Sequence, residues 1–305
     1  MGEQEHSPFT LETITDLIIA EIYKAFGIHP DSRVGRFIYP LIRVPAVRFS
    51  RIGMQFDEVV AQKGIAAGAS WALPNFIKGF LSFGEEKVPQ EGPLLVVSNH
   101  PGVADSLVLT AALRREDLKI IAGGIPFIMN LPHASQHFIF VNEDTHLRMN
   151  TCRSAIRHLE DGGSVLIFPS GRIDPDPAVM PGAPESIDRW SASIELFLRK
   201  VPDARLLVAI VSSVLTRHNV YHPLTRLRQT VMDRQRVAEF IQVMQNLILK
   251  KKADLLAQVS FANPVTVPEL QFIYRLEGVL ESIKATARAQ METHQRLPFH
   301  RQGAN

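Results

Sequence analysis

Short apolar runs that end in loops containing Gly or Pro, and that alternate with helical patterns, constrain the fold most. The runs are rich in Val, Ile, Leu and Phe, and they span residues 94–98, 118–122, 138–141, 164–168 and 205–215. Candidate helices lie at about residues 105–115, 145–160, 185–199, 229–249 and 269–291. Strands that alternate with helices are typical of a parallel sheet with helices on its faces. The sequence therefore predicts an α/β fold with a central, mostly parallel sheet flanked by helices.

The first quarter of the chain has a different pattern. Apolar residues recur at helical spacing from Leu11 to Phe26, which predicts an amphipathic helix. Further helical segments follow, and we expect breaks at four prolines, Pro30, Pro40, Pro45 and Pro74. We therefore expect a smaller N-terminal helical domain at residues 1–84 and an α/β domain at residues 85–305.

The longest nearly apolar stretch runs from Gly64 to Gly84 and approaches the length of a membrane span. Pro74, Asn75 and Lys78 interrupt it, which disfavours a spanning helix because such a helix must satisfy its backbone internally. Two interpretations stay open. The segment is either a surface at a membrane interface or acyl chain, lined by Trp71, Phe76, Phe80 and Phe83, or a buried helix pair that turns at Pro74.

Composition excludes several classes of protein. The 305 residues are 46% hydrophobic, which is enough for at least one sizeable core. A lone cysteine, Cys152, cannot form an intramolecular disulfide or a multi-thiolate zinc site. The formal net charge of +2 gives no global field for nucleic-acid binding. Since the first residues are acidic and lack a signal-peptide pattern, we expect a cytoplasmic protein, with peripheral attachment to the inner membrane face as an open alternative.

Polar residues follow directly after the run at residues 94–98. His100 lies there, at the expected carboxyl end of a strand, where functional groups gather in α/β sheets. Pro101 and Gly102 permit a tight turn that could return Asp105, at the start of the next helix, to the imidazole. A carboxylate that holds an imidazole leaves its other nitrogen free to take a proton from an alcohol. The alternative is a loop histidine beside a helix-capping aspartate, because this spacing also occurs by chance.

A second loop follows the run at residues 164–168. It reads Pro169-Ser170-Gly171-Arg172, in which Gly171 allows close backbone approach and Arg172 offers a planar fork for phosphate or carboxylate. The alternative for Arg172 is an ion pair with Asp174 or Asp176 in a rigid turn. Ser170 lacks the G-x-S-x-G pattern of a hydrolase nucleophile, so we interpret it as a loop hydroxyl.

Together, Asn99-His100-x4-Asp105 and Phe168-Pro169-Ser170-Gly171-Arg172 resemble the glycerol-3-phosphate and lysophosphatidic acid acyltransferase superfamily, which reads N-H-x4-D and then F-P-E-G-T-R. The run Phe138-Ile139-Phe140-Val141-Asn142 resembles the second block of that family, and Leu207-Val208-Ala209-Ile210-Val211 resembles the fourth. The resemblance covers roughly residues 85–215. With Pro175-Asp176-Pro177, the third block is most similar to that of soluble plastid-type glycerol-3-phosphate acyltransferases, which also place a helical domain before the catalytic one.

The chain departs from the family at positions that contact phosphate. Ser170 stands in place of the Glu of the third block, Asn142 in place of the usual Arg of the second, and Asp174 in place of the second Arg of the plastid form. The fourth block lacks its customary Pro. The phosphate site is thus reduced to Arg172, with Arg148 or Arg153 as helpers, and an acceptor without phosphate stays open as an alternative.

The resemblance implies transfer of a fatty acyl group from acyl-CoA or acyl carrier protein to a hydroxyl of glycerol-3-phosphate or a lysophospholipid-like acceptor. His100 and Asp105 would be catalytic, and backbone N–H groups near Gly171 would stabilise the oxyanion. The resemblance implies no metal, no cofactor and no nucleic-acid partner. Its substrate-binding residues would be Asn99, Ser170, Gly171, Arg172, Arg148 and Arg153. An inactive lipid-binding or acyl-carrier-binding protein of the same fold, and a serine hydrolase using Ser170, are the competing hypotheses.

The segment from Arg217 to Lys252 is locally basic. Such a segment could bind anionic lipid headgroups or an acidic carrier protein. The alternative is a solvated helix face, since runs of charge are common on exposed helices.

Overall fold

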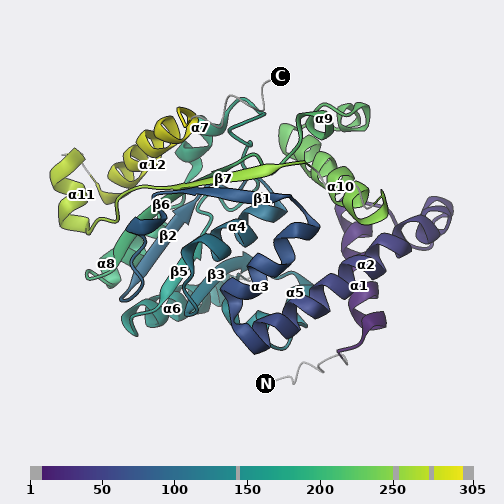
Figure 1. Ribbon diagram of the computed structural model, residues 1–305, viewed down its shortest axis with the longest axis horizontal. Helices are drawn as coiled ribbons and strands as arrows, with labels where there is room; N and C mark the ends of the chain where they lie inside the picture. The colour runs from purple at the N-terminus through teal and green to yellow at the C-terminus, as the bar shows by residue number, and fades with distance from the viewer. Residues whose placement is uncertain (1–8, 142–144, 250–253, 275–277, 298–305) are drawn as a thin grey trace.

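The computed structural model describes residues 9–141, 145–249, 254–274 and 278–297, with the backbone alone at residues 145–148 and 249. Its described strands form one seven-stranded sheet in the order β1-β7-β6-β2-β5-β3-β4 (Figure 1). The strands are β1 (Gly79–Phe83), β2 (Leu94–Ser98), β3 (Leu118–Gly123), β4 (Phe138–Val141), β5 (Ser164–Ile167), β6 (Arg205–Ser212) and β7 (Leu256–Phe261). Neighbouring strands are parallel except for β6 and β7, which are antiparallel. The mostly parallel α/β fold expected from the sequence is confirmed.

Helices surround the sheet and precede it. The α-helices are α1 (Leu11–Phe26), α2 (Arg33–Lys63), α3 (Ile65–Ala72), α4 (Val103–Leu113), α5 (Pro126–Met129), α6 (Thr145–Glu160), α7 (Ala183–Ser186), α8 (Ser193–Lys200), α9 (Arg217–Val220), α10 (Val231–Leu249), α11 (Val267–Tyr274) and α12 (Val279–Gln295). Short 3-10 turns are η1 (Leu73–Asn75), η2 (Glu85–Lys87), η3 (Ala134–His137), η4 (Ile187–Arg189) and η5 (Pro223–Leu227).

The sheet separates two apolar layers, which explains why the first four residues of β2 are all apolar. Leu94 and Val96 pack with α3 and α4 on one face, whereas Leu95 and Val97 pack with α6, α8 and α12 on the other. Side chains alternate between the faces of a strand, so a strand covered on both sides has no polar positions. This burial holds β2 at the centre of the molecule and fixes the place where its carboxyl end opens into a loop.

Two strands of the sheet, β1 and β7, were not among the strands predicted from the sequence. β1 pairs in parallel with β7, and its five residues are all half-buried. An edge strand of this kind lacks both the continuous apolar run of a buried strand and a clear alternation, which explains why its pattern was weak. Because β1 precedes residue 84, the sheet begins within the segment that was expected to form the helical domain.

The expected breaks at Pro40 and Pro45 were wrong, because both lie inside the continuous helix α2. A proline inside a helix removes one backbone hydrogen bond and favours a kink. Here the helix is kept by packing, since Ile42 and Ala46 of α2 form one apolar cluster with α1. The burial of an apolar face has outweighed the local cost of the two prolines.

The apolar segment from Gly64 to Gly84 forms a helix, a turn and a strand. Ile65 begins α3 as a buried residue, Pro74 lies in the turn η1, and the chain then enters β1. Phe76 is buried in the core, whereas Trp71 is 38% exposed. A helix with the length and apolar character needed to cross a membrane does not occur in the part of the chain that the structure describes.

Candidate active site

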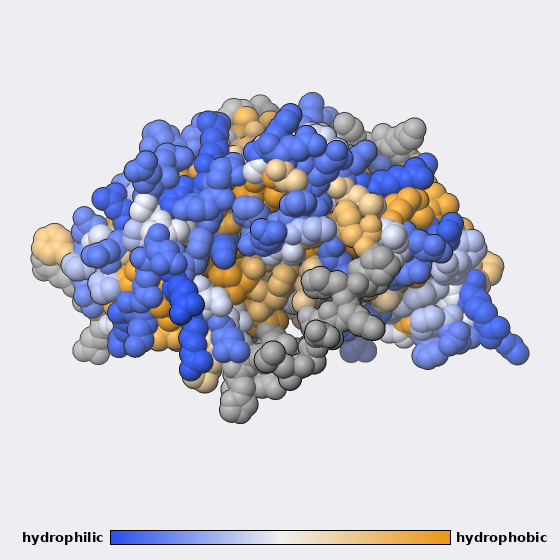
Figure 2. All heavy atoms as spheres, turned by 90° about the horizontal axis from the view of Figure 1, so that it is seen from below, coloured by the Kyte–Doolittle hydropathy of each residue, from blue (hydrophilic) through white to orange (hydrophobic). Residues whose placement is uncertain are grey.

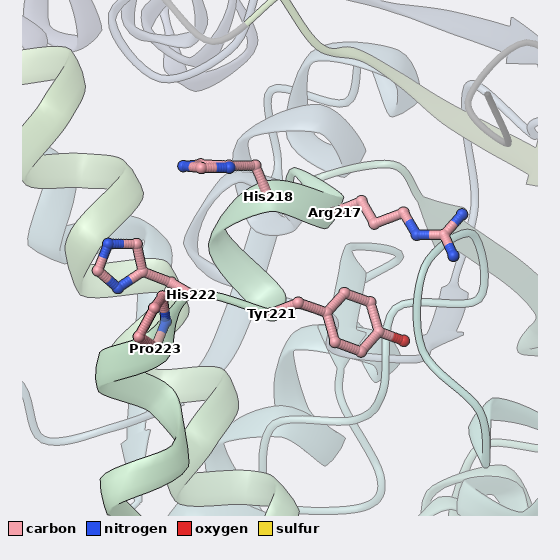
Figure 3. A pocket seen from close by; sticks show the side chains of 5 residues that line it. All are labelled: Arg217, His218, Tyr221, His222 and Pro223. Atoms are coloured by element: carbon pink, nitrogen blue, oxygen red, sulfur yellow. The ribbon is translucent and has the colours of Figure 1, made fainter.

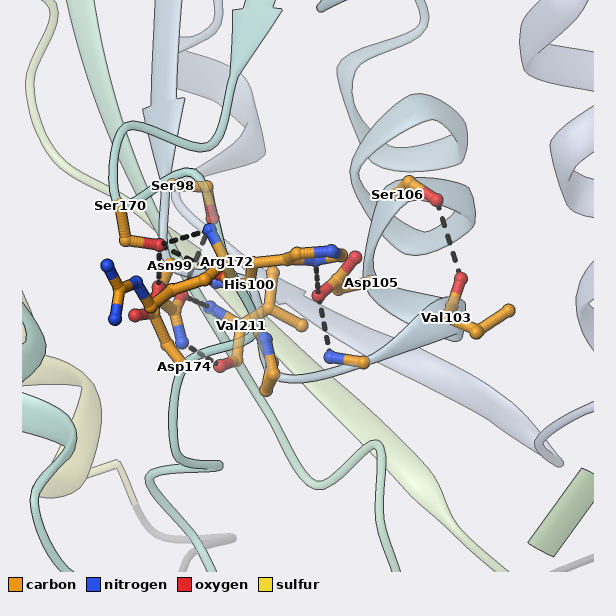
Figure 4. A network of polar contacts seen from close by, with 12 residues as sticks. Ser98, Asn99, His100, Val103, Asp105, Ser106, Ser170, Arg172, Asp174 and Val211 are labelled. Atoms are coloured by element: carbon orange, nitrogen blue, oxygen red, sulfur yellow. Dashed lines mark hydrogen bonds and ion pairs between the residues drawn. The ribbon is translucent and has the colours of Figure 1, made fainter. Parts of the chain in front are cut away.

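The loop between β2 and α4 places His100 beside Asp105 at the carboxyl edge of the sheet. Nδ1 of His100 lies 2.8 Å from Oδ2 of Asp105, which also accepts the N–H of Gly102 at 2.9 Å (Figure 4). The Asp105 side chain is fully buried, whereas that of His100 is 29% exposed. The structure therefore brings the two residues together with Nε2 of the imidazole on the side away from the carboxylate.

Three carboxylates favour the protonated form of His100. Burial alone would lower the pKa of the imidazole, but the charge and hydrogen bond of Asp105 raise it, and Glu239 and Asp174 add to the effect. The net result raises the pKa of His100 from 6.5 to about 9. Phe168 stacks on the imidazole with 4.4 Å between ring centroids and 27° between planes, which restricts the ring to one orientation.

Asn99 attaches the loop after β2 to the neighbouring strand β6. Its side chain is fully buried, with Nδ2 donating to the carbonyl of Val211 and Oδ1 accepting the N–H of Val211, both at 2.8 Å. These bonds continue the pairing of β2 with β6 beyond the end of the strand. Both polar atoms of the amide are thus engaged, which makes Asn99 a support of the loop, whereas the family resemblance implied a substrate contact.

Asp174 holds the backbone of His100 from the second loop. Its Oδ2 accepts the N–H of His100 at 3.1 Å and the hydroxyl of Ser170 at 2.9 Å, and its own N–H donates to the carbonyl of His100 at 2.7 Å. Arg189 forms an ion pair of 3.4 Å with Oδ1 of Asp174. The alternative in which Arg172 pairs with this carboxylate is therefore wrong, because Arg189 takes that place.

Asp176 organises the loop that follows β6. The carboxylate is fully buried and accepts four backbone N–H groups, from Ala178, Ser213, Val214 and Leu215, at 2.9 to 3.2 Å. Asp176 thus ties the second site loop to the end of β6. Its place in the third block therefore reflects backbone support, and the expected pairing with Arg172 is wrong here too.

Arg172 is the exposed cation of the second loop. Its guanidinium has no ion pair among the described residues, and it extends to the side opposite the His100 ring (Figure 4). The backbone of Gly171 has a left-handed φ of 64°, and its N–H donates to the carbonyl of Phe168 at 3.0 Å. This N–H is therefore engaged within the loop, whereas the role of other backbone N–H groups near Gly171 as oxyanion donors stays a prediction.

Both helper residues, Arg148 and Arg153, lie on α6. Arg153 is exposed and has no polar partner among the described side chains. The side chain of Arg148 lies outside the described part of the chain, as does Asn142. The expected roles of Arg153 and Arg148 in substrate binding therefore both stay predictions.

Helix α10 brings two residues that the sequence argument did not single out. Gln235 is 2% exposed, and its Nε2 donates to the carbonyl of Pro101 at 2.9 Å and to that of Asp174 at 2.7 Å. Glu239 accepts the N–H of Val103, the first residue of α4, and burial raises its pKa from 4.5 to about 7. The sequence carries a pattern that could have indicated these residues, because polar side chains recur at helical spacing at positions 235, 239, 242 and 246.

A hollow of about 500 Å³ lies beside the second loop and is lined by Arg217, His218, Tyr221, His222 and Pro223 (Figure 3). The guanidinium of Arg217 lies over the Tyr221 ring at 5.9 Å, and the Tyr221 hydroxyl donates to the carbonyl of Val179 at 3.4 Å. The hollow therefore adjoins the loop that carries Asp174 and Asp176. The three lysines at positions 250–252, which complete the predicted basic segment, lie outside the described residues.

Metal-binding groups are not a feature of this site. Within the described ranges, no cluster of three or more His, Cys, Asp or Glu side chains could hold a metal ion.

A buried carboxylate that holds a partly exposed imidazole at the carboxyl edge of an α/β sheet is an arrangement that suits general-base catalysis on an alcohol. Residues 81–190 match the family model described as Acyltransferase. This match bears out the superfamily expected from the four sequence blocks and supports an acyltransferase enzyme. The closer similarity to the plastid type stays a prediction.

Among the solved structures similar to this chain is the 1-acyl-sn-glycerophosphate (LPA) acyltransferase PlsC from Thermotoga maritima. The two chains are 14% identical, with a TM-score of 0.42 over 94% of this chain and 97% of that one. No curated protein matches the chain in sequence.

Proposed function

We propose that the protein transfers a fatty acyl group from an acyl thioester to a hydroxyl of a lysophosphatidate-like glycerolipid. The observation that carries the proposal is the 2.8 Å contact between Nδ1 of His100 and the buried Asp105. It fixes which nitrogen of the imidazole is turned away from the carboxylate, and the ring is exposed enough to meet a substrate. The acyltransferase domain at residues 81–190 supports the same reaction class.

The chemical steps follow from that geometry. Nε2 of neutral His100 removes the proton of the acceptor hydroxyl as its oxygen attacks the thioester carbonyl. A carbon–oxygen bond forms and a tetrahedral oxyanion results. Asp105 stabilises the imidazolium. When the carbon–sulfur bond breaks, the imidazolium returns the proton to the leaving thiolate, so that an ester and a free thiol are the products. A positioned base supplies about 10²–10⁴-fold, and holding both substrates together supplies much of the rest.

The acceptor phosphate is proposed to bind Arg172. This guanidinium is exposed and without an ion pair among the described residues, and its planar fork suits a phosphate. Ser170 and Gly171 would shape this loop rather than contact the reacting atoms, since the Ser170 hydroxyl already donates to Asp174 and to the carbonyl of Arg172.

An acceptor without phosphate is the second candidate. It is favoured by Asp174, which stands in place of a family arginine and presents a carboxylate that is neutralised by Arg189. A neutral acceptor would not need the charge of Arg172.

The basic surface near the hollow is proposed to meet an anionic partner, either acyl carrier protein or anionic membrane. Arg217 and Arg226 are exposed beside the exposed apolar side chains Leu224, Leu227 and Val231. Mixed cations and apolar groups suit the interface of an anionic membrane. Figure 2 shows the face that is turned downward in Figure 1, where apolar patches also lie among hydrophilic side chains. Co-sedimentation with anionic and neutral vesicles at rising salt tests the membrane alternative, because screened charges release the protein.

The decisive experiment is an acceptor screen. Palmitoyl-CoA and palmitoyl acyl carrier protein are each offered with lysophosphatidate, glycerol-3-phosphate and monoacylglycerol, and the lipid products are identified by mass spectrometry. Acylated lysophosphatidate with release of one thiol per ester is the expected result. Absence of product with every pair, alongside measurable binding of the donor, would instead favour an inactive binding protein of the same fold.

The hydrolase alternative has its own test. Ser170 donates its hydroxyl proton within its own loop and has no recorded imidazole partner among the described residues. We therefore expect no labelling of Ser170 by a fluorophosphonate probe, and labelling would reopen that hypothesis.

A further inference from the structure

Helix α10 attaches to the loops at the carboxyl edge of the sheet through polar side chains. A surface helix ordinarily buries an apolar stripe. Here the buried side also carries Gln235, Gln242 and Asn246, which are 2, 6 and 8% exposed. Gln242 bonds the backbone of Val214 at 2.7 Å and that of Thr216 at 2.8 Å, and Asn246 donates to the carbonyl of Phe76 at 2.7 Å.

Gln235 differs from the others because it bonds both loops of the active site at once. Its two amide hydrogens point to different carbonyls, one on Pro101 and one on Asp174. Pro101 follows His100 directly, and Asp174 exchanges two further hydrogen bonds with the backbone of His100. Two hydrogen bonds therefore join the two loops directly at His100, and the two bonds of Gln235 add a bridge from one loop to the other.

We propose that Gln235 is a positioning residue of the acyltransferase, holding the His100 loop and the Ser170–Asp174 loop in the relative position that acyl transfer requires. The inference rests on the proposed function. It assigns to Gln235 no contact with substrate, and its effect passes through the backbone on either side of the reacting imidazole.

The chemistry of a side-chain amide explains why glutamine suits this place. Both carbonyls need a donor, and a buried carbonyl without one is costly. Glutamate has the same shape but, when ionised, offers no donor, and methionine has a similar length with no polar hydrogen. Since displacements of about 1 Å at a reacting centre can cost 10²-fold in rate, loss of this bridge is expected to act on the chemical step.

The test compares Gln235→Met and Gln235→Glu with wild type, using palmitoyl-CoA and lysophosphatidate as substrates. The control is Gln245→Met on the same helix. Gln245 is half-buried, and its side chain makes no hydrogen bond among the described residues. We expect kcat to fall about 10- to 100-fold in both Gln235 variants, with KM within about threefold of wild type and Tm within a few degrees. The control should match wild type in all three quantities.

Each outcome decides the proposal. Wild-type kcat in the Gln235 variants would overturn the positioning role while leaving the proposed function intact, whereas an inactive wild type would overturn the function itself. A rise in KM at constant kcat would assign Gln235 to substrate binding and also overturn the proposal. If Gln235→Met does not fold, Gln235→Glu serves alone. Failure of both to fold would assign the residue to stability and reject the positioning role.

Discussion

The imidazole of His100 is held at 2.8 Å by Asp105, and the backbone of the same histidine exchanges two hydrogen bonds with Asp174, 74 positions later. One residue is thus fixed by its side chain from within its own loop and by its main chain from a second loop. This double attachment sets the direction in which Nε2 can meet an alcohol.

The first prediction concerns the base itself. His100→Ala should lower kcat by about 10²–10⁴-fold, because the positioned base is removed while the binding surfaces stay. Tm should stay within a few degrees of wild type, since the His100 side chain is partly exposed. Steady-state thiol release and thermal melts measure both, with the exposed His29→Ala as control. Full turnover in His100→Ala would remove this residue from the mechanism.

The second prediction is a pH dependence. Because neighbouring carboxylates raise the pKa of His100 to about 9, most of the free protein carries the imidazolium at neutral pH. The neutral base forms only as the pH rises, so log kcat/KM should increase with unit slope from pH 7 and level off near pH 9. Initial rates between pH 6 and 10 measure the profile. A plateau that begins below pH 7 contradicts the assignment.

The same titration affects stability. The pKa of His100 is higher in the folded state, at about 9, than its ordinary value of 6.5, so the folded state binds the proton more tightly. Its contribution to the free energy of unfolding is complete below about pH 6.5 and is lost as the pH rises through 9. Urea unfolding of wild type and His100→Ala across this range should show a stability difference that shrinks with rising pH. A constant difference speaks against the linkage.

Substitution of Glu239 should shift the pH dependence of kcat/KM, because Glu239 helps to raise the pKa of His100. Its carboxylate lies against the start of α4 and contributes to the raised pKa of His100. Glu239→Gln keeps an acceptor for the N–H of Val103 but removes the charge, so the pKa of His100 should fall. We expect the rise of kcat/KM to begin at lower pH and the rate at pH 7.5 to increase. The exposed Glu12→Gln serves as control, and an unchanged profile would exclude electrostatic coupling between the two groups.

Asp176 is expected to contribute to stability. Asp176→Asn replaces one acceptor oxygen by an N–H donor group among four backbone N–H groups. Leaving such buried donors unpaired should cost about 1–3 kcal/mol of unfolding free energy. Urea denaturation of this variant and of the exposed control Asp203→Asn makes the comparison. Equal stability of the two variants would show that the loop rearranges at little cost.

Arg172 separates the two acceptor classes. Arg172→Ala should reduce kcat/KM for lysophosphatidate about tenfold or more through loss of a charge-assisted hydrogen bond, with monoacylglycerol unaffected. The exposed Arg43→Ala on α2 is the control, because no role in the site is assigned to Arg43. Equal losses with charged and neutral acceptors would place the phosphate elsewhere.

The part of the site that could be predicted from sequence is the part built locally. Five positions separate His100 from Asp105, and a strand, a turn and a helix start bring them together without help from distant residues. The bounds of β2 and β4 were also predicted, from their runs of consecutive apolar residues. In β2 this run reflects burial on both faces of the sheet, whereas in β4 only Ile139 is buried.

The remaining features depend on long-range contacts. The partners of Gln235 are main-chain carbonyls 134 and 61 positions away, and a carbonyl carries no sequence signature. β1 becomes a strand by pairing with β7, and α2 continues through its prolines because α1 packs on it. In each case the tertiary partner, rather than the local residue pattern, decides the outcome.

The attachment of α10 has a consequence for redesign. Gln235 donates to main-chain carbonyl oxygens, which every amino acid possesses. Side chains of the Ser170–Asp174 loop that make no hydrogen bond can therefore be exchanged while the bond from Gln235 to the loop is kept. Arg172 and Ile173, whose side chains make no hydrogen bond among the described residues, are thus the natural positions for a library aimed at new acceptor alcohols.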